Sequence, residues 1–243
     1  MSARAVLRAG AAAAGGLALL HAAPSVTSIQ PLEPLRTRLL PRLAGVGDPG
    51  HVALTFDDGP DRASTPRFLE VLEKAGVKAT FFLLGFMLER DLGLGRELAA
   101  AGHEVGVHGW RHKPMLLRGP RATYDDLARA RDLVAAATGR LPRHYRPPYG
   151  IATTAALASA RGLGMRPVLW TSWGQDWRAK ATPESVYRTV TRNLRGGGTV
   201  LLHDADCTSA PEAWRSTLGA LPRLLEHCGD RGWRVGPLAE HGA

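Results

Sequence analysis

Cysteine is scarce in this chain of 243 residues, which contains only Cys207 and Cys228. Neither belongs to a C-x-x-C pair, so nothing supports a redox motif or a cysteine-based zinc site. Sequence alone does not show whether their Cβ atoms converge. One disulfide in an exported protein and two buried free thiols are therefore equally compatible with the sequence.

Lysine is scarce as well, and arginine supplies most of the positive charge. Lys and Arg together number 31 against 22 Asp and Glu, for a formal net charge of +9. The basic residues form no run and no stretch interleaved with aromatics, so nucleic-acid binding is not predicted. The charge favours loose adhesion to an acidic polymer. The only lysines are Lys74, Lys78, Lys113 and Lys180.

The N-terminal apolar stretch contains little Leu or Ile. Arg4 and Arg8 precede an uncharged stretch over residues 9–32 with a modestly apolar centre, which is typical of a secretory signal. No clean A-x-A cleavage site follows, so cleavage and retention as a weak membrane anchor both stay open. We predict a signal peptide or N-terminal anchor over residues 1–28, and a secreted or cell-envelope-associated protein. A disordered tail is the alternative.

The body of the chain has the composition of a globular domain. A hydrophobic content of 44% is ordinary for a soluble protein, and the length fits one domain of the α/β-barrel size range. From His51 onward, short apolar runs alternate with helical patterns, which predicts βα units and a mostly parallel sheet. Residues 29–50, with four prolines and no clear period, are predicted to be a linker. Strands are predicted at residues 51–56, 79–84, 104–108, 144–147, 167–170, 199–203 and 233–235.

Three helices have well-marked ends in the sequence. The helix predicted over residues 66–75 has Thr65 as N-cap and Gly76 as its C-terminal stop. Amphipathic spacing predicts two more, over residues 121–138 and 183–194. In a β/α barrel the loops after the strands meet at one face, where the chemistry is usually built, so motifs at strand ends carry the functional signal.

Two adjacent carboxylates, Asp57 and Asp58, end the first predicted strand in the run T-F-D-D-G-P. Neighbouring side chains can share one site while pointing differently, so one carboxylate can ligate a cation and the other can handle a proton. A lone Asp-Asp-Gly-Pro is more often a polar turn. Because this pair lies at a strand end, a functional role competes with the interpretation as a polar turn.

Two histidines, His108 and His112, follow the third predicted strand. On a helical turn this spacing would place both imidazoles on one face, within reach of a single ion, although such pairs also arise by chance in a chain with nine histidines. Together with Asp58 they would form a two-His, one-carboxylate site with open positions for water and substrate. That is the arrangement of a catalytic metal site.

The fourth and sixth predicted strands end in further polar residues. Arg146, Pro147 and Tyr149 lie in the run R-P-P-Y-G, whose prolines force an extended backbone. This loop is either merely rigid, or it supplies an arginine that pairs with a carboxylate and a backbone N–H aimed at the reaction centre. His203 follows an apolar run at the same rim. A lone histidine there is usually structural, but a general acid is needed at this place.

These motifs together resemble the polysaccharide deacetylase family, the NodB-homology carbohydrate esterases of family 4. The resemblance covers about residues 52–238, in which T-F-D-D-G-P, H-x-x-x-H, R-P-P-Y-G and L-L-H-D recur in order. The segment W-T-S-W-G-Q-D-W at residues 170–177 resembles the family's remaining element. The resemblance implies an α/β fold, a distorted seven- or eight-stranded (β/α) barrel of the NodB-homology type, with a catalytic domain over residues 51–240.

The family pattern implies a role for each matching residue. Asp57 would be the general base, held by Arg146. His203 would be the general acid, oriented by Asp176. The implied metal ligands are Asp58, His108 and His112, and the residues implied to bind substrate are Tyr149, Leu201, Trp177 and Pro147.

The implied activity is metal-dependent hydrolysis of N-acetyl groups on an amino-sugar polymer or oligomer, chitin-like or of the peptidoglycan type, with release of acetate. Zinc is the default ion because it suits imidazole and carboxylate ligands, and cobalt, nickel or iron could replace it. The expected partner is an N-acetylated glycan, without nucleic acid or a dedicated protein partner. Gly109, where the family commonly has Ser or Thr, and Trp173, where an acidic residue is common, put substrate preference in question.

Three other functions fit parts of the pattern. An acetyl-ester hydrolase acting on a plant-type polysaccharide would use the same residues. A non-haem iron oxygenase also uses two histidines and a carboxylate, but it would leave Asp57, Arg146 and His203 without roles. A non-catalytic glycan-binding domain on the same scaffold is disfavoured, because every catalytic position is filled.

Overall fold

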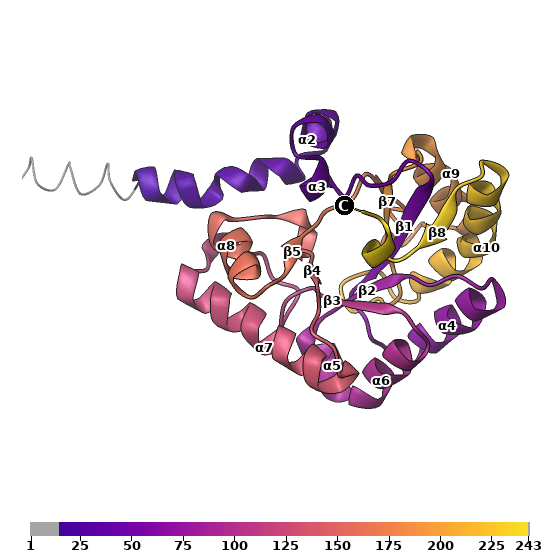
Figure 1. Cartoon of the computed structure of the whole chain (residues 1–243), viewed down its shortest axis with the longest axis horizontal. Helices are drawn as coiled ribbons and strands as arrows, with labels where there is room; N and C mark the ends of the chain where they lie inside the picture. Colours follow the sequence, from indigo (N-terminus) through magenta and orange to yellow (C-terminus); the bar gives the residue numbers. More distant parts are fainter. Residues whose placement is uncertain (1–14, 243) are drawn as a thin grey trace, which may run out of the picture.

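A curled, eight-stranded parallel sheet forms the centre of the molecule, with helices around its outside (Figure 1). The computed structural model describes residues 15–242. Hydrogen bonds connect the strands in the order β5-β4-β3-β2-β1-β7-β6, with β8 beside β1. The predicted α/β fold with a distorted barrel is therefore confirmed. The strands are β1 His51–Asp57, β2 Thr80–Leu83, β3 Glu104–Val107, β4 His144–Tyr145, β5 Arg166–Pro167, β6 Ser172–Trp173, β7 Thr199–His203 and β8 Arg234–Gly236.

The barrel is open on one side. Within the described part of the chain, no strand pairing joins β5 to β6, so the sheet ends at these two strands. Residues 168–171 connect them. We call this gap the open seam.

Helices cover the outer face of the sheet and bury its apolar side chains. Phe68 on α4 packs edge-on against Phe56 of β1, with ring centroids 5.2 Å apart, and Phe56 stacks on Phe81 of β2 at 5.0 Å. All three rings are fully buried, and burial of this kind supplies most of the stabilisation of such a core. The helices are α4 Thr65–Lys74, α5 Gly85–Arg90, α6 Leu92–Ala100, α7 Pro120–Thr138, α8 Thr154–Gly162, α9 Pro183–Asn193 and α10 Trp214–Asp230, with short 3-10 turns η3 Met115–Leu117, η4 Pro148–Gly150 and η5 Leu238–Glu240.

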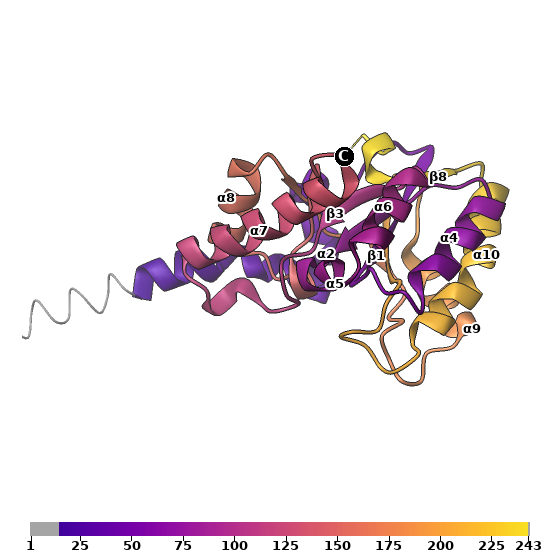
Figure 2. The same ribbon diagram turned by 90° about the horizontal axis from the view of Figure 1, so that it is seen from below.

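The parallel register brings the predicted motifs to one rim. Asp57 at the end of β1 pairs with His203 at the end of β7, and Val107 of β3 pairs with Tyr145 of β4. The residues that follow these strands therefore leave the sheet at the same level. In Figure 2 the loops that lead into α9 and α10 project at the bottom of the view.

Much of residues 29–44, in the segment predicted to be a linker, is helical, and so is the end of the predicted leader. Residues 15–22 are helical, and η1 Ala23–Ser28, η2 Gln30–Leu32, α2 Glu33–Leu39 and α3 Pro41–Ala44 follow. Prolines stand in the first turns of η1, α2 and α3, where the missing N–H costs nothing, so they start these helices rather than prevent them. The boundaries proposed between leader, linker and catalytic domain stay a prediction.

Several local details differ from the sequence prediction. Strand β6 was not predicted because two residues are too few to show a period. The N-cap of α4 is Ser64, not Thr65, and the Thr65 hydroxyl donates to the Asp204 carboxylate at 2.5 Å. Cys207 and Cys228 are both free.

The predicted secretory leader is only partly visible. Residues 1–14 of it lie outside the described residues. Among residues 15–242, no helix combines the length and the apolarity needed to cross a bilayer.

Candidate active site

Asp58, His108 and His112 converge at the carboxyl ends of β1 and β3. One ligand atom from each lies within 4.8 Å of the others, and Oδ1 of Asp58 is 3.5 Å from Nε2 of either histidine. Residues 108–112 do not form a helical turn, since Gly109 has a φ of 97° and the segment bends. The two imidazole rings nevertheless lie 5.1 Å apart.

Burial favours the neutral form of both histidines, and a hydrogen bond fixes the orientation of His108. Nδ1 of His108 must donate to the carbonyl oxygen of Arg146, 2.8 Å away, so its Nε2 presents a lone pair to Asp58. Burial lowers the pKa of His108 to about 3, and burial also lowers the pKa of His112. The short contact of His108 with Asp58 is therefore not an ion pair.

This donor set fits a divalent metal ion. Within the described residues, the buried Oδ1 of Asp58 has no hydrogen-bond partner. It lies 3.5 Å from Nε2 of both imidazoles, and an unpaired carboxylate oxygen beside the Nε2 lone pair of His108 is costly unless a cation lies between them. Two imidazoles and one carboxylate are ligands that suit zinc and related ions.

Asp57 is held from behind by Arg146. Nη1 of Arg146 donates to Oδ1 of Asp57 at 2.8 Å, and Nη2 donates to the carbonyl oxygen of Leu169 at 2.9 Å. The Arg146 side chain is fully buried, with its guanidinium 4.2 Å from the ring centroid of Phe82. Burial raises the pKa of Asp57, although the Arg146 charge opposes this rise. The carboxylate is thus fixed in one orientation and has a heightened affinity for a proton.

His203 is paired with a second buried carboxylate. Nδ1 of His203 lies 2.9 Å from Oδ1 of Asp176, and its backbone N–H donates to Oδ2 at 2.8 Å. Thr217 donates to the same Oδ2. Burial alone would lower the pKa of His203, but the Asp176 carboxylate outweighs it and raises the pKa to about 10. The imidazole therefore carries a proton at neutral pH.

A cavity of about 210 Å³ lies between these groups, with three tryptophans on one side. The ring centroid of Trp173 is 6.1 Å from that of Trp170 and 4.9 Å from that of Trp177. Trp177 in turn meets the His203 ring edge-on. We call these three residues the tryptophan wall. Trp173, one of the two departures from the family pattern, forms its middle.

The cavity brings together most of the predicted site residues. Asp58, Arg146, Pro147 and Asp176 are buried and do not line it. Thr208 and Ser209 line it but were not predicted. The Thr208 hydroxyl donates to Oδ2 of Asp58, and the only sequence signal for it was a polar loop after the sixth predicted strand. The predicted residues that line the cavity are Asp57, His108, His112, Tyr149, Trp177, Leu201 and His203.

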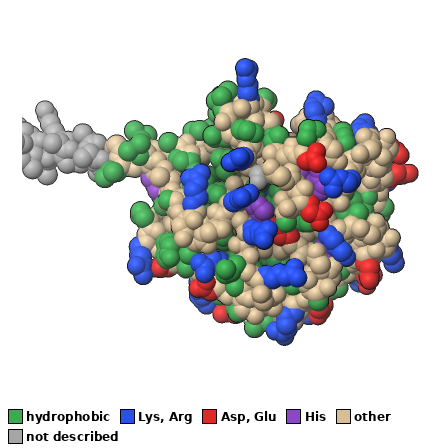
Figure 3. All heavy atoms as spheres, in the orientation of Figure 1, with side chains coloured by type: hydrophobic (Ala, Val, Ile, Leu, Met, Phe, Trp, Pro, Cys, Tyr) green, Lys and Arg blue, Asp and Glu red, His purple; other side chains and the backbone are tan. Residues whose placement is uncertain are grey.

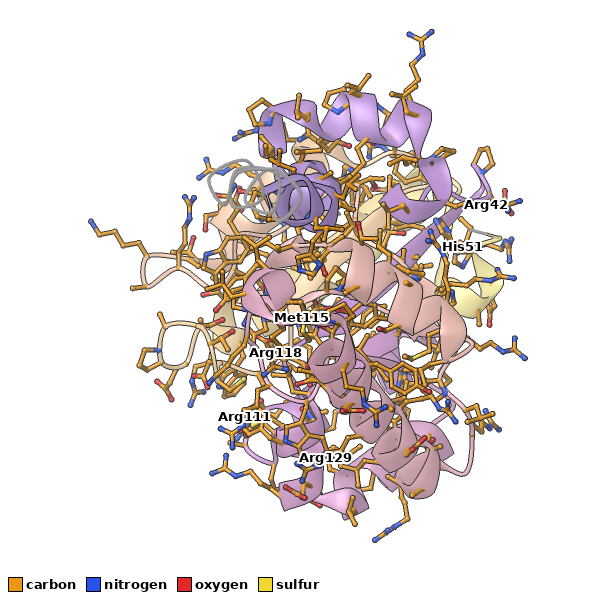
Figure 4. The ribbon with its side chains drawn as sticks, turned by 90° about the vertical axis from the view of Figure 1, so that its left-hand side faces the viewer. Arg42, His51, Arg111, Met115, Arg118 and Arg129 are labelled. Carbon is orange, nitrogen blue, oxygen red and sulfur yellow. The ribbon has the colours of Figure 1, made fainter. Side chains whose placement is uncertain are left out.

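The loop between the two histidines is braced by α7. Oδ1 of Asp126 accepts a hydrogen bond from the backbone N–H of Trp110 at 2.8 Å. Oδ2 of Asp126 pairs with Arg118, and Arg129 lies over the Trp110 ring at 3.4 Å from its centroid; both arginines are labelled in Figure 4. Because L side chains rarely adopt the φ of Gly109, the glycine is explained by backbone conformation.

Comparison with known proteins places these residues in a family. The family model described as polysaccharide deacetylase matches residues 44–168. The chain is 36% identical to the chitooligosaccharide deacetylase of Bradyrhizobium sp. (strain ANU 289) over 197 residues, which cover 78% of this chain and 89% of that protein. It is 32% identical over 191 residues to the peptidoglycan-N-acetylglucosamine deacetylase of Bacillus cereus, with coverage of 78% and 86%.

Solved structures agree with this relationship. The family 4 carbohydrate esterase from Streptomyces lividans, solved with acetate, has a TM-score of 0.70 at 30% identity, with 80% of this chain and 96% of that chain covered. A family 4 pseudoenzyme from Bacillus anthracis has a TM-score of 0.72 at 29% identity, with coverage of 79% and 65%. The chain therefore belongs to the polysaccharide deacetylase family and is a hydrolase of that type.

Proposed function

We propose that this protein hydrolyses N-acetyl groups on an amino-sugar polymer or oligomer, chitin-like or of the peptidoglycan type, and releases acetate. The observation that carries the proposal is the placement of two opposite proton-handling groups at one cavity, the arginine-held carboxylate of Asp57 and the protonated imidazole of His203. The relatives named for chitooligosaccharide and peptidoglycan deacetylation support the substrate class.

The metal ion is proposed to bind Asp58, His108 and His112. Zinc is the expected ion, and cobalt, nickel or iron could replace it. When bound, such an ion lowers the pKa of bound water and polarises the acetyl carbonyl. The Thr208 hydroxyl, which donates to Asp58, would fix the orientation of this ligand.

The side chains of the cavity are proposed to divide the proton transfers between them. Asp57 takes a proton from the attacking water as its oxygen adds to the acetyl carbon. The backbone N–H of Tyr149 donates to the developing oxyanion, an interaction typically worth about 3 kcal/mol of barrier. His203 gives its proton to the nitrogen as the C–N bond breaks, so the products are acetate and a free amine.

The remaining residues are proposed to hold the sugar. Leu201 and Trp177 line the cavity and would flank the acetyl group. Trp173 would extend this apolar surface under a pyranose ring. Pro147, which does not line the cavity, would act only by fixing the backbone before Tyr149.

Secretion or attachment to the cell envelope is part of the proposal. The uncharged stretch after Arg4 and Arg8 is the feature that supports export. A glycan substrate would be reached there, without nucleic acid or a dedicated protein partner. Weak membrane attachment through residues 1–28 is the accompanying hypothesis.

Acetate release tests the proposal directly. Purified protein loaded with zinc is incubated with chitooligosaccharide, N-acetylated peptidoglycan and acetylxylan, each with and without a chelator. Release from the N-acetylated substrates that the chelator abolishes is the expected result. Release from acetylxylan alone would instead establish the ester hydrolase, and glycan binding without any release would establish a non-catalytic domain, like the structurally similar pseudoenzyme.

Two substitutions separate the base from the metal ligands. Asp57→Asn should lower kcat by at least about 100-fold while the protein retains its metal ion. His112→Ala should lose both activity and metal. The measurements are initial rates and metal content after dialysis, and equal metal loss in the two variants would contradict the division of roles between Asp57 and Asp58.

A further inference from the structure

The N-terminal segment closes the open seam next to the active site. The carbonyl oxygen of Leu43 accepts a hydrogen bond from the backbone N–H of Leu169 at 2.7 Å. The Leu43 side chain packs against the buried cluster of Leu169, Trp170 and Leu201. Apart from its last residue, this segment of residues 23–44 lies before the region that the family model matches, residues 44–168. Figure 1 shows α2 and α3 beside the sheet.

Arg36 on α2 joins this segment to the active site through a buried guanidinium. Its side chain is only 4% exposed. Nη1 donates to the carbonyl oxygen of Thr27, and Nη2 donates to the carbonyl oxygen of Trp170, both at 2.6 Å. Among the described residues no carboxylate forms an ion pair with it. A buried cation is costly unless its hydrogen bonds are well made, so these two main-chain bonds define where the helix sits.

The carbonyl groups of two consecutive residues are thereby held by two arginines. Arg36 holds Trp170, and Arg146, which tethers Asp57, holds Leu169. The Trp170 ring lines the cavity, and it lies so close to Gly150 that an added Cβ would stand 2.8 Å from it. In addition, η1 contacts η4, which carries Tyr149. Displacement of residues 169–170 would therefore move both the tryptophan wall and the anchor of Arg146.

We propose that residues 23–43 are part of the catalytic unit and that Arg36 is a positioning residue for the reaction. This inference rests on the proposed deacetylase function. The N-terminal residues would then serve export and, separately, the positioning of the active site. Any processing of an exported chain has to leave Thr27 in place, because its carbonyl oxygen is one end of the Arg36 clamp.

Arg36→Met in the full chain tests the positioning role, with Arg38→Met as its matched control. Arg38 lies on the same helix but is exposed. We expect Arg36→Met to lower kcat by about 10- to 100-fold, because a small misplacement of reacting groups has effects of this size. KM should stay within about twofold, since the substrate contacts remain. The control should keep the wild-type kcat, and a wild-type kcat in Arg36→Met would overturn the proposal.

Arg36→Lys separates positioning from mere stability. A lysine keeps the charge and one hydrogen bond but not the two-pronged geometry, so kcat should recover only part of the loss while the melting temperature stays near that of the wild type. If Arg36→Met fails to fold, this variant carries the test alone. A wild-type kcat in Arg36→Lys together with failure of Arg36→Met would show a structural role and overturn the proposal.

Hydrogen exchange tests the inference without a measurement of catalytic activity. Peptides covering residues 169–172 should exchange faster in Arg36→Met than in Arg38→Met, because the Leu169 amide loses its support. If the wild-type protein released no acetate from any glycan, the proposed function would fail while this measurement still stood. Unchanged exchange would overturn the coupling. A mature secreted chain that begins after Thr27 and is fully active would overturn it too.

Discussion

At the scale of single residues, the site uses the same side-chain types for different work by changing their surroundings. Asp57 is bound by an arginine, whereas Asp58 next to it is buried against two imidazoles. The pKa values of the histidines differ for the same reason. Burial lowers the pKa of His108, and the Asp176 carboxylate raises that of His203. The proposed roles of acid, base and ligand therefore follow from the neighbours of each residue and not from its type.

The His203–Asp176 pair predicts how activity depends on pH. Because the folded pKa of His203 is raised to about 10, its stabilising charge interaction is complete below the ordinary value near 6.5 and is lost as the pH rises through about 10. The proton that it would donate disappears over the same upper range. We expect Asp176→Asn to shift the alkaline limb of kcat/KM to lower pH and to lower kcat about 100-fold at neutral pH.

Thr217→Val is the milder comparison for this prediction, since it removes one hydrogen bond to Asp176 and leaves the charge. Its alkaline limb should move much less than that of Asp176→Asn. The measurement is the rate of acetate release between pH 6 and pH 11. An unchanged alkaline limb in Asp176→Asn would show that His203 is not the acid.

At the scale of elements, the long, buried strands could be predicted from the sequence, whereas the irregular segments could not. The strands β1 and β7 were predicted because strands buried on both faces appear as continuous apolar runs. The spacing of His108 and His112 also fits a helical turn, but the segment bends where Gly109 has a φ of 97°. The contact of Thr208 with Asp58 joins residues 150 positions apart, and no local pattern signals it.

His103, in the turn between α6 and β3, predicts how the fold responds to acid. Its Nδ1 accepts a hydrogen bond from the backbone N–H of Ala79, and its ring packs edge-on against Phe81. Burial lowers its pKa to about 4, with a smaller contribution from Lys78. The neutral ring therefore stabilises the fold above about pH 6.5, and this contribution is lost as the pH falls toward 4.

His103→Gln should reduce this acid sensitivity, because an amide oxygen can still accept from Ala79 but cannot be protonated. Between pH 6.5 and pH 4, the wild type should lose more unfolding free energy than the variant, by an amount on the order of 2 kcal/mol. Urea denaturation at several pH values measures it. Parallel pH curves for the two proteins would refute the assignment.

At the scale of the whole molecule, the basic residues are scattered along the sequence and form no run. Figure 3 shows Lys and Arg side chains distributed over one face with Asp and Glu between them. The net charge of +9 nevertheless creates a long-range field that attracts anionic polymers. The field is the sum over all charged side chains and cannot be assigned to a single residue.

The charge predicts weak, salt-sensitive retention on an anionic polysaccharide. Because the screening length falls from about 30 Å at 0.01 M salt to about 3 Å at 1 M, binding should be measurable only at low ionic strength. Co-sedimentation with the polymer across a salt series measures this. Lys180→Glu and Arg223→Glu, both at exposed positions, should each weaken retention slightly. Retention that persists at 1 M salt would point to a specific site instead.

The tryptophan wall has a practical consequence. Three of the six tryptophans of the chain line the cavity, so a large share of its indole fluorescence comes from the place where substrate would bind. A sugar that displaces water from these rings should change the intensity and the emission wavelength. Occupancy of the site could then be followed optically in the unlabelled protein, even in variants too slow to turn over.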